Sequence, residues 1–271
     1  MATRKITAHR IAVFDADGTL FRWQMLEIWI EMMVMMGLFP SIVLDRARPS
    51  FDAYRNRDGA FETFIRAIVA AYSDELRMRG IRVSDAVHVA ERVVKTHGLQ
   101  TYVFTRELAR AAAECGYRRS FISGAPKIVV DPFARLHGFD PSLCYGTVHP
   151  QEDGFFTGQQ AVTWFDRKGQ ALDELRAEHR LDLRRSVAIG DTESDIPMLE
   201  RVGYPLCMCP NSALLAVAVE RRWPVIIERK DVIYVLRSNR KRRLAGVSPK
   251  SILPADISPL INARVGCAIA R

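Results

Sequence analysis

The sequence predicts an α/β protein with a Rossmann-like, doubly wound and mostly parallel sheet that carries an inserted all-helical cap domain. Two observations predict this class. From about residue 119 onward, short apolar runs typical of buried strands alternate with amphipathic stretches typical of helices. By contrast, residues 22 to about 115 carry apolar residues at helical spacing and contain no strand pattern. A helical block of this length is too large for a simple crossover between parallel strands, so we interpret it as an insertion.

The elements follow in chain order. The first strand is predicted at residues 11–14, a short, apolar and partly β-branched run. The helical block after it contains four stretches at helical spacing, at residues 25–36, 51–72, 83–96 and 101–115. The alternating part then gives strand 119–124, helix 126–137, a hairpin of 143–148 and 154–157, helix 166–178, strand 186–190, strand 204–209, helix 212–221 and strand 224–227. The core is therefore predicted at 1–21 and 105–235, with the cap at 22–104.

Residues 236–271 are predicted to form a basic, partly ordered C-terminal tail. The tail opens with a basic run at 237–243, and Pro, Ser and Ala dominate after it. Such a run could bind nucleic acid or acidic lipid. We interpret it as solvated, because no aromatic side chains are interleaved with the charges, and we expect no nucleic-acid partner.

Composition and cysteine usage indicate the general class of the protein and its compartment. The 271 residues are 48% hydrophobic and 26% charged, which is ordinary for a soluble globular protein. We attribute the net charge of +8 to an arginine-rich composition. Five cysteines without a C-x-x-C pair, and a basic leader without an apolar run, predict a cytoplasmic protein with no disulfide framework. The methionine-rich stretch 25–36 is interrupted by Glu27 and Glu31, so we predict a buried helix and no transmembrane segment.

The stretch FDADGTLF, residues 14–21, places two carboxylates where the first strand ends. Asp15 and Asp17 follow the apolar run directly, and Gly18 permits a tight turn just beyond them. Open α/β sheets bind their ligands at the carboxyl ends of the strands. Two unpaired anionic groups there would be costly, so a cation or a shared proton must compensate them.

Two further strands end in polar turns, and the ends of neighbouring parallel strands converge in space. The first turn carries Ser123-Gly124, the second carries Asp191 and Asp195, and Lys168 opens the helix before the second strand. Carboxylate oxygens are natural ligands of Mg²⁺, which also binds substrate phosphate. A hydroxyl beside a glycine suits a phosphate oxygen, and a lysine supplies a point charge. The pattern therefore favours a magnesium-assisted phosphate site.

Four segments in order carry a resemblance to a known family. They are FDADGTLF, FISGAP, the lysine of FDRKGQAL, and AIGDTESDIPML. Together they resemble the motifs of the haloacid-dehalogenase-like superfamily of phosphohydrolases, and most closely its phosphoserine-phosphatase-like branch, in which a helical cap follows the first motif. The similarity spans roughly residues 10 to 227. It implies a Mg²⁺-dependent phosphomonoesterase that hydrolyses a small organic phosphate through an aspartyl-phosphate.

The resemblance also implies roles for individual residues. Asp15 would be the nucleophile, and Asp17 the general acid and base. Asp191 would bind Mg²⁺ together with Asp15 and the main-chain carbonyl of Asp17, and Asp195 would support that metal site. A carboxylate nucleophile divides one hard displacement into two easier ones, and a second carboxylate can serve both.

The phosphate contacts and the substrate contacts complete the expected site. Ser123 and Gly124 would bind the phosphate, and Lys168 would neutralise it. Arg22 and Gln24 are candidate substrate contacts, because they follow the nucleophile turn. Gln24 stands where phosphoserine phosphatases have a glutamate for the substrate ammonium, so phosphoserine is not the expected substrate; a small phosphorylated metabolite is.

Two other functions are compatible with these residues. A phosphotransferase would pass the same aspartyl-phosphate to an acceptor alcohol. A non-catalytic binding or scaffold protein could retain the fold and use the methionine-rich cap and the basic tail as contact surfaces. The intact set of acidic and basic motif residues favours an enzyme. The oligomeric state is left open.

Overall fold

The structure is a computed structural model that describes residues 8–72, 78–159, 161–239, 244–248, 251–264 and 267–268. The basic leader at 1–7 and residues 240–243 of the basic run lie outside these ranges. None of the helices in the described ranges has the length and apolarity needed to cross a membrane.

A nine-stranded sheet forms the centre of the described part, in the order β10-β9-β8-β7-β6-β1-β2-β3, with β11 paired to β9. Along this order, every neighbouring pair between β8 and β3 (β8-β7-β6-β1-β2-β3) is parallel. Strand β9, by contrast, is antiparallel to both β8 and β10. This topology confirms the predicted doubly wound, mostly parallel sheet. The strands are β1 (Ile11–Phe14), β2 (Arg118–Pro126), β3 (Tyr145–Thr147), β6 (Val187–Gly190), β7 (Tyr204–Met208), β8 (Val225–Arg229), β9 (Val232–Ser238), β10 (Leu244–Gly246) and β11 (Cys267–Ala268).

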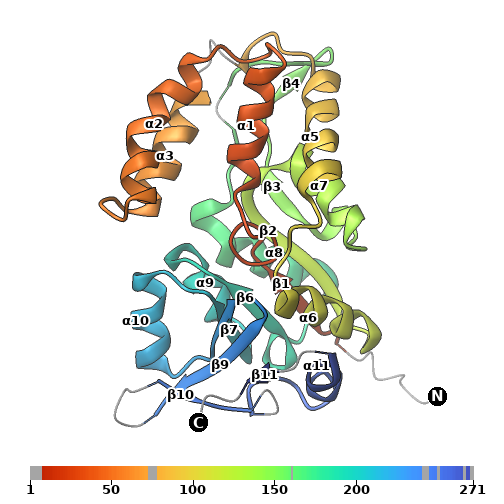
Figure 1. The fold of residues 1–271 in the computed structure, drawn as a ribbon. Coiled ribbons are helices and arrows are strands. Elements are labelled where there is room, and N and C mark those ends of the chain that lie inside the picture. Colours follow the sequence, from red (N-terminus) through yellow and green to blue (C-terminus); the bar gives the residue numbers. More distant parts are fainter. Residues whose placement is uncertain are drawn as a thin grey trace, which may run out of the picture.

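Helices lie in two groups. Figure 1 shows α1, α2, α3 and α5 together above the sheet, and the other labelled helices around the sheet or beside its upper end. The helices are α1 (Met25–Met35), α2 (Ile42–Arg55), α3 (Phe61–Tyr72), α5 (Val83–His97), α6 (Val103–Glu114), α7 (Lys127–Leu136), α8 (Lys168–His179), α9 (Ile196–Leu199), α10 (Ser212–Arg221) and α11 (Ser258–Arg264).

Strand β1 shows why the sheet carries helices on both faces. All four of its residues are buried, so the strand reads as a continuous apolar run. Alternate side chains enter different clusters: Ala12 and Phe14 join the larger cluster, while Ile11 and Val13 join the smaller one. The period of two along a strand produces this division.

The predicted helix at 51–72 is wrong in one respect, because two helices occupy this region. Helix α2 ends at Arg55 and α3 begins at Phe61. Between them Arg57 has a φ of 65°, a left-handed conformation that an α-helix cannot contain. Apolar side chains continue at helical spacing on both sides of this turn, so periodicity alone does not reveal the break.

The predicted hairpin of 143–148 with 154–157 is also wrong. Strand β3 instead pairs in parallel with β2, and the hairpin consists of β4 (Gln151–Glu152) and β5 (Phe155–Phe156). A period of two identifies a strand but not its partner. Gly146 lets β3 lie close to the first residue of α7, since a Cβ on this glycine would lie 2.8 Å from Cα of Lys127.

The β4–β5 hairpin connects to the upper helices rather than to the sheet. The amide of Gly80 donates to the carbonyl of Phe156, and the amide of Val83 donates to that of Gly154, each at 2.9 Å. Residues 236–271 also contribute defined elements, because β10 and β11 both pair with β9. The division into core, cap and tail at the predicted boundaries stays a prediction.

Candidate active site

The first acidic turn lies at the centre of the sheet. Strand β1 pairs with β2 on one side and β6 on the other, so the polar turns after these three strands become neighbours. The turn needs Gly18 for two reasons. Its φ is 78°, and a Cβ there would lie only 2.1 Å from Oδ2 of Asp191. Gly18 therefore lets the turns after β1 and β6 touch.

Lys168 connects two of the buried carboxylates. Its Nζ donates to Oδ1 of Asp15 at 2.6 Å and to Oδ1 of Asp195 at 2.5 Å. Helix α8 begins at Lys168, which positions the ammonium, and all three side chains are nearly or fully excluded from solvent. Burial alone would lower the pKa of Lys168, but the two carboxylates raise it above its usual value. The lysine is therefore held in its charged form.

Asp195 has both oxygens engaged by the protein. While Oδ1 accepts from Lys168, Oδ2 accepts the backbone amides of Asp191 and Thr192, each at 3.0 Å. Gly190 leaves room for this side chain, because a Cβ there would lie 2.3 Å from its carboxyl carbon. Asp195 thus shapes the loop that carries Asp191.

Three carboxylates form a compact group. One oxygen from each of Asp15, Asp191 and Asp195 lies within 4.8 Å of the others. Burial raises the pKa of Asp15 to about 6, with Lys168 opposing the shift and Asp195 adding to it. Burial, and then repulsion from Asp15 and Asp195, raises the pKa of Asp191 well above its usual range. Hard oxygen donors with excess negative charge suit a divalent cation, so these residues fit a metal.

Asp17 lies outside the carboxylate group and has different partners. Its Oδ1 accepts the amide of Met25 at 2.6 Å, where α1 begins, and its Oδ2 accepts the hydroxyl of Ser123 at 3.4 Å. Burial and the charge of Asp15 raise its pKa to about 7. Near neutral pH this carboxyl group can therefore hold or release a proton.

The second polar turn, near the end of β2, is largely enclosed by the protein. Ser123 is fully buried, and its Oγ also accepts the amide of Ala125 at 3.0 Å. Gly124 lines the cavity described next, and a Cβ on it would come within 3.3 Å of the Phe165 side chain. Phosphate binding by Ser123, Gly124 and Lys168 stays a prediction.

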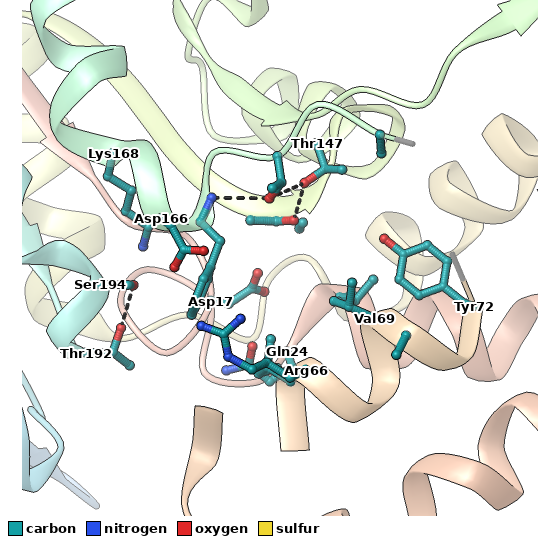
Figure 2. Close-up of a pocket in the computed structure, with 18 of the residues that line it drawn as sticks. Asp17, Gln24, Arg66, Val69, Tyr72, Thr147, Asp166, Lys168, Thr192 and Ser194 are labelled. Carbon is teal, nitrogen blue, oxygen red and sulfur yellow. Dashed lines mark hydrogen bonds between the residues drawn. The ribbon is translucent and has the colours of Figure 1, made fainter. Parts of the chain in front are cut away.

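A cavity of about 700 Å³ lies between the acidic turns and α3. Figure 2 shows Lys168 and Asp17 on one side, Tyr72 and Val69 on the other, and Arg66 near Asp17 and Gln24. The apolar part of the wall consists of Leu26, Phe61, Ile65, Val69, Ala70, Tyr72, Ala125, Ala161 and Phe165. Sequence reasoning missed Arg66 and Thr147. Arg66 is exposed on α3, where its Nη2 lies 2.6 Å from Oε1 of Glu62, and periodicity did not show that this side of the helix lines the cavity.

The two predicted substrate contacts have different surroundings. Gln24 lines the cavity. Arg22 is not among its lining residues, and its guanidinium is engaged elsewhere: Nη2 donates to Oε1 of Glu228 at 2.5 Å and Nε to the carbonyl of Thr101 at 3.0 Å. Glu228, distant in sequence, thus binds the Arg22 guanidinium outside the cavity lining.

The fold and the site together define a Rossmann-like enzyme with an acidic, lysine-neutralised centre at the carboxyl ends of its central strands. Residues 12–200 match the family model of the haloacid dehalogenase-like hydrolases, and the chain belongs to this family.

The chain is also similar in sequence to individual proteins. The chain is 33% identical over 143 residues to the inhibition of morphological differentiation protein of Streptomyces azureus, covering 52% of this chain and 48% of that protein. It is 32% identical over 123 residues to phosphoserine phosphatase SerB1 of Mycobacterium tuberculosis, covering 45% and 39%. The chain thus spans less than half the length of these two relatives.

A solved structure shares the fold. It is described as a phospho-aspartyl intermediate analogue of phosphoserine phosphatase and superposes with a TM-score of 0.57 at 18% identity, covering 83% of this chain and 95% of that one. At this identity the likeness concerns the fold alone.

Proposed function

We propose that the protein is a Mg²⁺-dependent phosphomonoesterase that hydrolyses a small organic phosphate through an aspartyl-phosphate on Asp15. The observation that carries the proposal is the ion pair between Lys168 and Asp15 at 2.6 Å, beside a second carboxyl group whose pKa is about 7. The names of the relatives support a phosphatase, and the carboxylate group supports a metal.

In the first half-reaction, Asp15 attacks the phosphorus atom. Lys168 holds Oδ1, which leaves Oδ2 to form the new bond. As the ester bond breaks, protonated Asp17 gives its proton to the leaving oxygen, and the alcohol departs. The products are an acyl phosphate on Asp15, a neutral alcohol and an ionised Asp17.

In the second half-reaction, Asp17 takes a proton from water as the water oxygen attacks phosphorus. The acyl phosphate bond breaks, Asp15 returns as a carboxylate, and inorganic phosphate leaves. Asp17 is protonated again, so the cycle closes. A pKa of about 7 suits this double role, because neither protonation state is strongly disfavoured at neutral pH.

Asp15 and Asp191, with the main-chain carbonyl of Asp17, would hold the Mg²⁺. When bound, the ion would offset the charge of the carboxylates and of the phosphate. Asp195 contributes by positioning, since its oxygens already bind Lys168 and the amides of the Asp191 loop. The cytoplasm stays a prediction as the location, as does a small phosphorylated metabolite as the substrate.

Turnover of 4-nitrophenyl phosphate by the full chain tests the proposal. We expect hydrolysis with Mg²⁺ and none with excess EDTA, and a loss of at least a thousandfold in Asp15→Asn, which removes the nucleophile. Asp45→Asn is the control, because Asp45 is exposed on α2. Turnover that does not depend on Mg²⁺, or that persists in Asp15→Asn, would refute the mechanism. A phosphorylated alcohol formed after adding glycerol would instead indicate a phosphotransferase.

A further inference from the structure

Arg22 lies in one of the two chain segments that join the upper helices, α1, α2, α3 and α5, to the rest of the protein. The first connection is residues 20–24, before α1, and the second is residues 98–102, between α5 and α6. The two connections bind one another through backbone hydrogen bonds, one of which runs from the amide of Arg22 to the carbonyl of Gln100 at 3.0 Å. A contact that holds one connection therefore also affects the other.

Glu228, on β8, binds both connections through one carboxylate. Its side chain is only 2% exposed. Oε1 accepts from Nη2 of Arg22 at 2.5 Å and from the amide of Val103 at 3.0 Å, and Oε2 accepts from the amide of Phe104 at 3.0 Å. Arg22 extends this contact, since its Nε donates to the carbonyl of Thr101 at 3.0 Å. Three donors thus satisfy a carboxylate that would be costly to bury alone.

Helix α6 obtains its N-terminal cap from this contact. The described residues at its start supply none, because Tyr102 at the N-cap position makes no capping hydrogen bond and the first turn contains no acidic residue. The free amides of a helix N-terminus favour an anionic acceptor, and Val103 and Phe104 donate two of them to Glu228. The start of α6, and with it the second connection, is therefore anchored to β8.

Helix α1 obtains its N-terminal cap from Asp17. Oδ1 of Asp17 accepts the amide of Met25 at 2.6 Å, whereas Gln24 at the N-cap position makes no side-chain cap. Only two residues separate Met25 from Arg22 in the sequence. A displacement of Arg22 would therefore move the amide that orients the Asp17 carboxyl group.

From these contacts we infer that Arg22 and Glu228 are positioning residues for Asp17. Glu228 holds Arg22, Arg22 fixes the first connection, and the start of α1 then orients Asp17. Neither Arg22 nor Glu228 is among the described residues that line the large cavity, so they act through Asp17 and not by contact with the substrate. The inference rests on the proposed function, in which Asp17 protonates the leaving oxygen.

The dependence of kcat/KM on the leaving group tests this role in the full chain with Mg²⁺. The leaving group of 4-nitrophenyl phosphate needs little protonation, whereas benzyl phosphate releases an alcohol that needs the proton of Asp17. The value of kcat/KM reports the first half-reaction, in which this proton is given. Glu228→Gln and Arg22→Gln should each lower kcat/KM for benzyl phosphate about tenfold more than for 4-nitrophenyl phosphate, because a misplaced acid loses part of its effect. A role in stability alone would lower both values equally.

Glu107→Gln is the matched control. Glu107 is also a nearly buried carboxylate that binds arginine side chains, Arg106 at 3.2 Å and Arg110 at 3.0 Å. We expect its glutamine variant to lose stability and to keep the wild-type ratio of the two kcat/KM values. The double variant Arg22→Gln/Glu228→Gln should change this ratio no more than either single variant, because both residues act through one contact.

Asp17→Asn distinguishes failure of the inference from failure of the proposed function. It should change the ratio by roughly a hundredfold or more, because the acid itself is lost. An unchanged ratio in Asp17→Asn would refute the proposed function and the inference with it. A changed ratio in Asp17→Asn but a wild-type ratio in folded Arg22→Gln would overturn the inference alone, as would an equal change in Glu107→Gln. Arg22→Gln decides the matter even where Glu228→Gln does not fold, since the Arg22 side chain is 37% exposed.

Discussion

Single residues decide whether the acidic turns can meet. Gly18 combines a left-handed φ of 78° with a 2.1 Å approach of its absent Cβ to Asp191. Lys168 then supplies one charge to two carboxylates, Asp15 and Asp195. An uncompensated buried carboxylate would be strongly destabilising, so this geometry depends on the lysine.

The substitution Gly18→Ala tests the close approach. We expect turnover to fall at least a hundredfold and the free energy of unfolding to fall by about 1–3 kcal/mol, because both strain and the clash with Asp191 displace the turn that carries Asp15 and Asp17. Steady-state kinetics and urea unfolding measure the two effects.

Gly37→Ala is the matched control for this prediction. Gly37 has a φ of 72°, but no atom lies within 4 Å of its added Cβ. Its alanine variant should lose about 1 kcal/mol of stability from backbone strain alone and keep wild-type turnover. Equal turnover in the two variants would contradict the role assigned to Gly18.

At the scale of elements, contacts between distant segments determine where helices and hairpins begin. Helix α1 starts at Met25, whose amide is bound by the Asp17 carboxylate at 2.6 Å. An anionic group at a helix N-terminus is stabilising. The same contact attaches α1 to the turn that carries Asp15 and Asp17. His149 has a comparable place between elements, with its ring near those of Tyr72 on α3 and Phe156 on β5.

His149 should make stability depend on pH. Burial lowers its pKa to about 4, from about 6.5 in the unfolded chain. Between these values the unfolded state binds more protons, so this residue's contribution to stability is complete above pH 6.5 and is lost as the pH falls toward 4, by roughly 3 kcal/mol in total.

Replacing His149 with leucine should remove this dependence. The free energy of unfolding of His149→Leu, measured by urea denaturation at pH 7 and pH 4.5, should fall less on acidification than that of the wild type. His88→Leu, at an exposed position on α5, should retain the wild-type slope. Identical slopes for His149→Leu and wild type would show that this ring does not remain neutral in the fold.

For the whole molecule, the proposed binding of Mg²⁺ by the carboxylate group should couple metal binding to folding. Two buried carboxylates and the half-buried Asp191 share one lysine. Burial raises the pKa of Asp15 and of Asp191, and repulsion between the carboxylates adds to both shifts. Mg²⁺ that binds only the folded state should stabilise it by about 2.7 kcal/mol at a hundred times its Kd. We expect thermal unfolding to show a higher Tm with Mg²⁺ and reversal by EDTA.

The variant Asp191→Asn should distinguish electrostatic repulsion among the carboxylates from binding of Mg²⁺. Without metal it should be at least as stable as the wild type, because one of the mutually repelling carboxylates is gone. With Mg²⁺ it should gain little, whereas Asp45→Asn should respond as the wild type does. A full Mg²⁺ response in Asp191→Asn would place the ion elsewhere.

Much of the architecture could be predicted from the sequence. Buried strands are short apolar runs, and the turns after 11–14 and 186–190 carry their aspartates at the strand ends, so the mostly parallel sheet and its acidic turns could be predicted directly. The break at Arg57 and the partner of β3 could not be predicted, because hydrophobic period carries no information about a turn or a pairing partner.

The sequence by itself determined which residue types stand at which strand ends, because period and turn chemistry are local properties. Only the tertiary structure decided where their side chains point. Arg22 binds Glu228 and does not line the cavity, α3 places Arg66 in the cavity lining, and Asp17 binds the first turn of α1. These directions depend on partners that the fold brings together from distant parts of the chain, and spacing along the chain does not contain them.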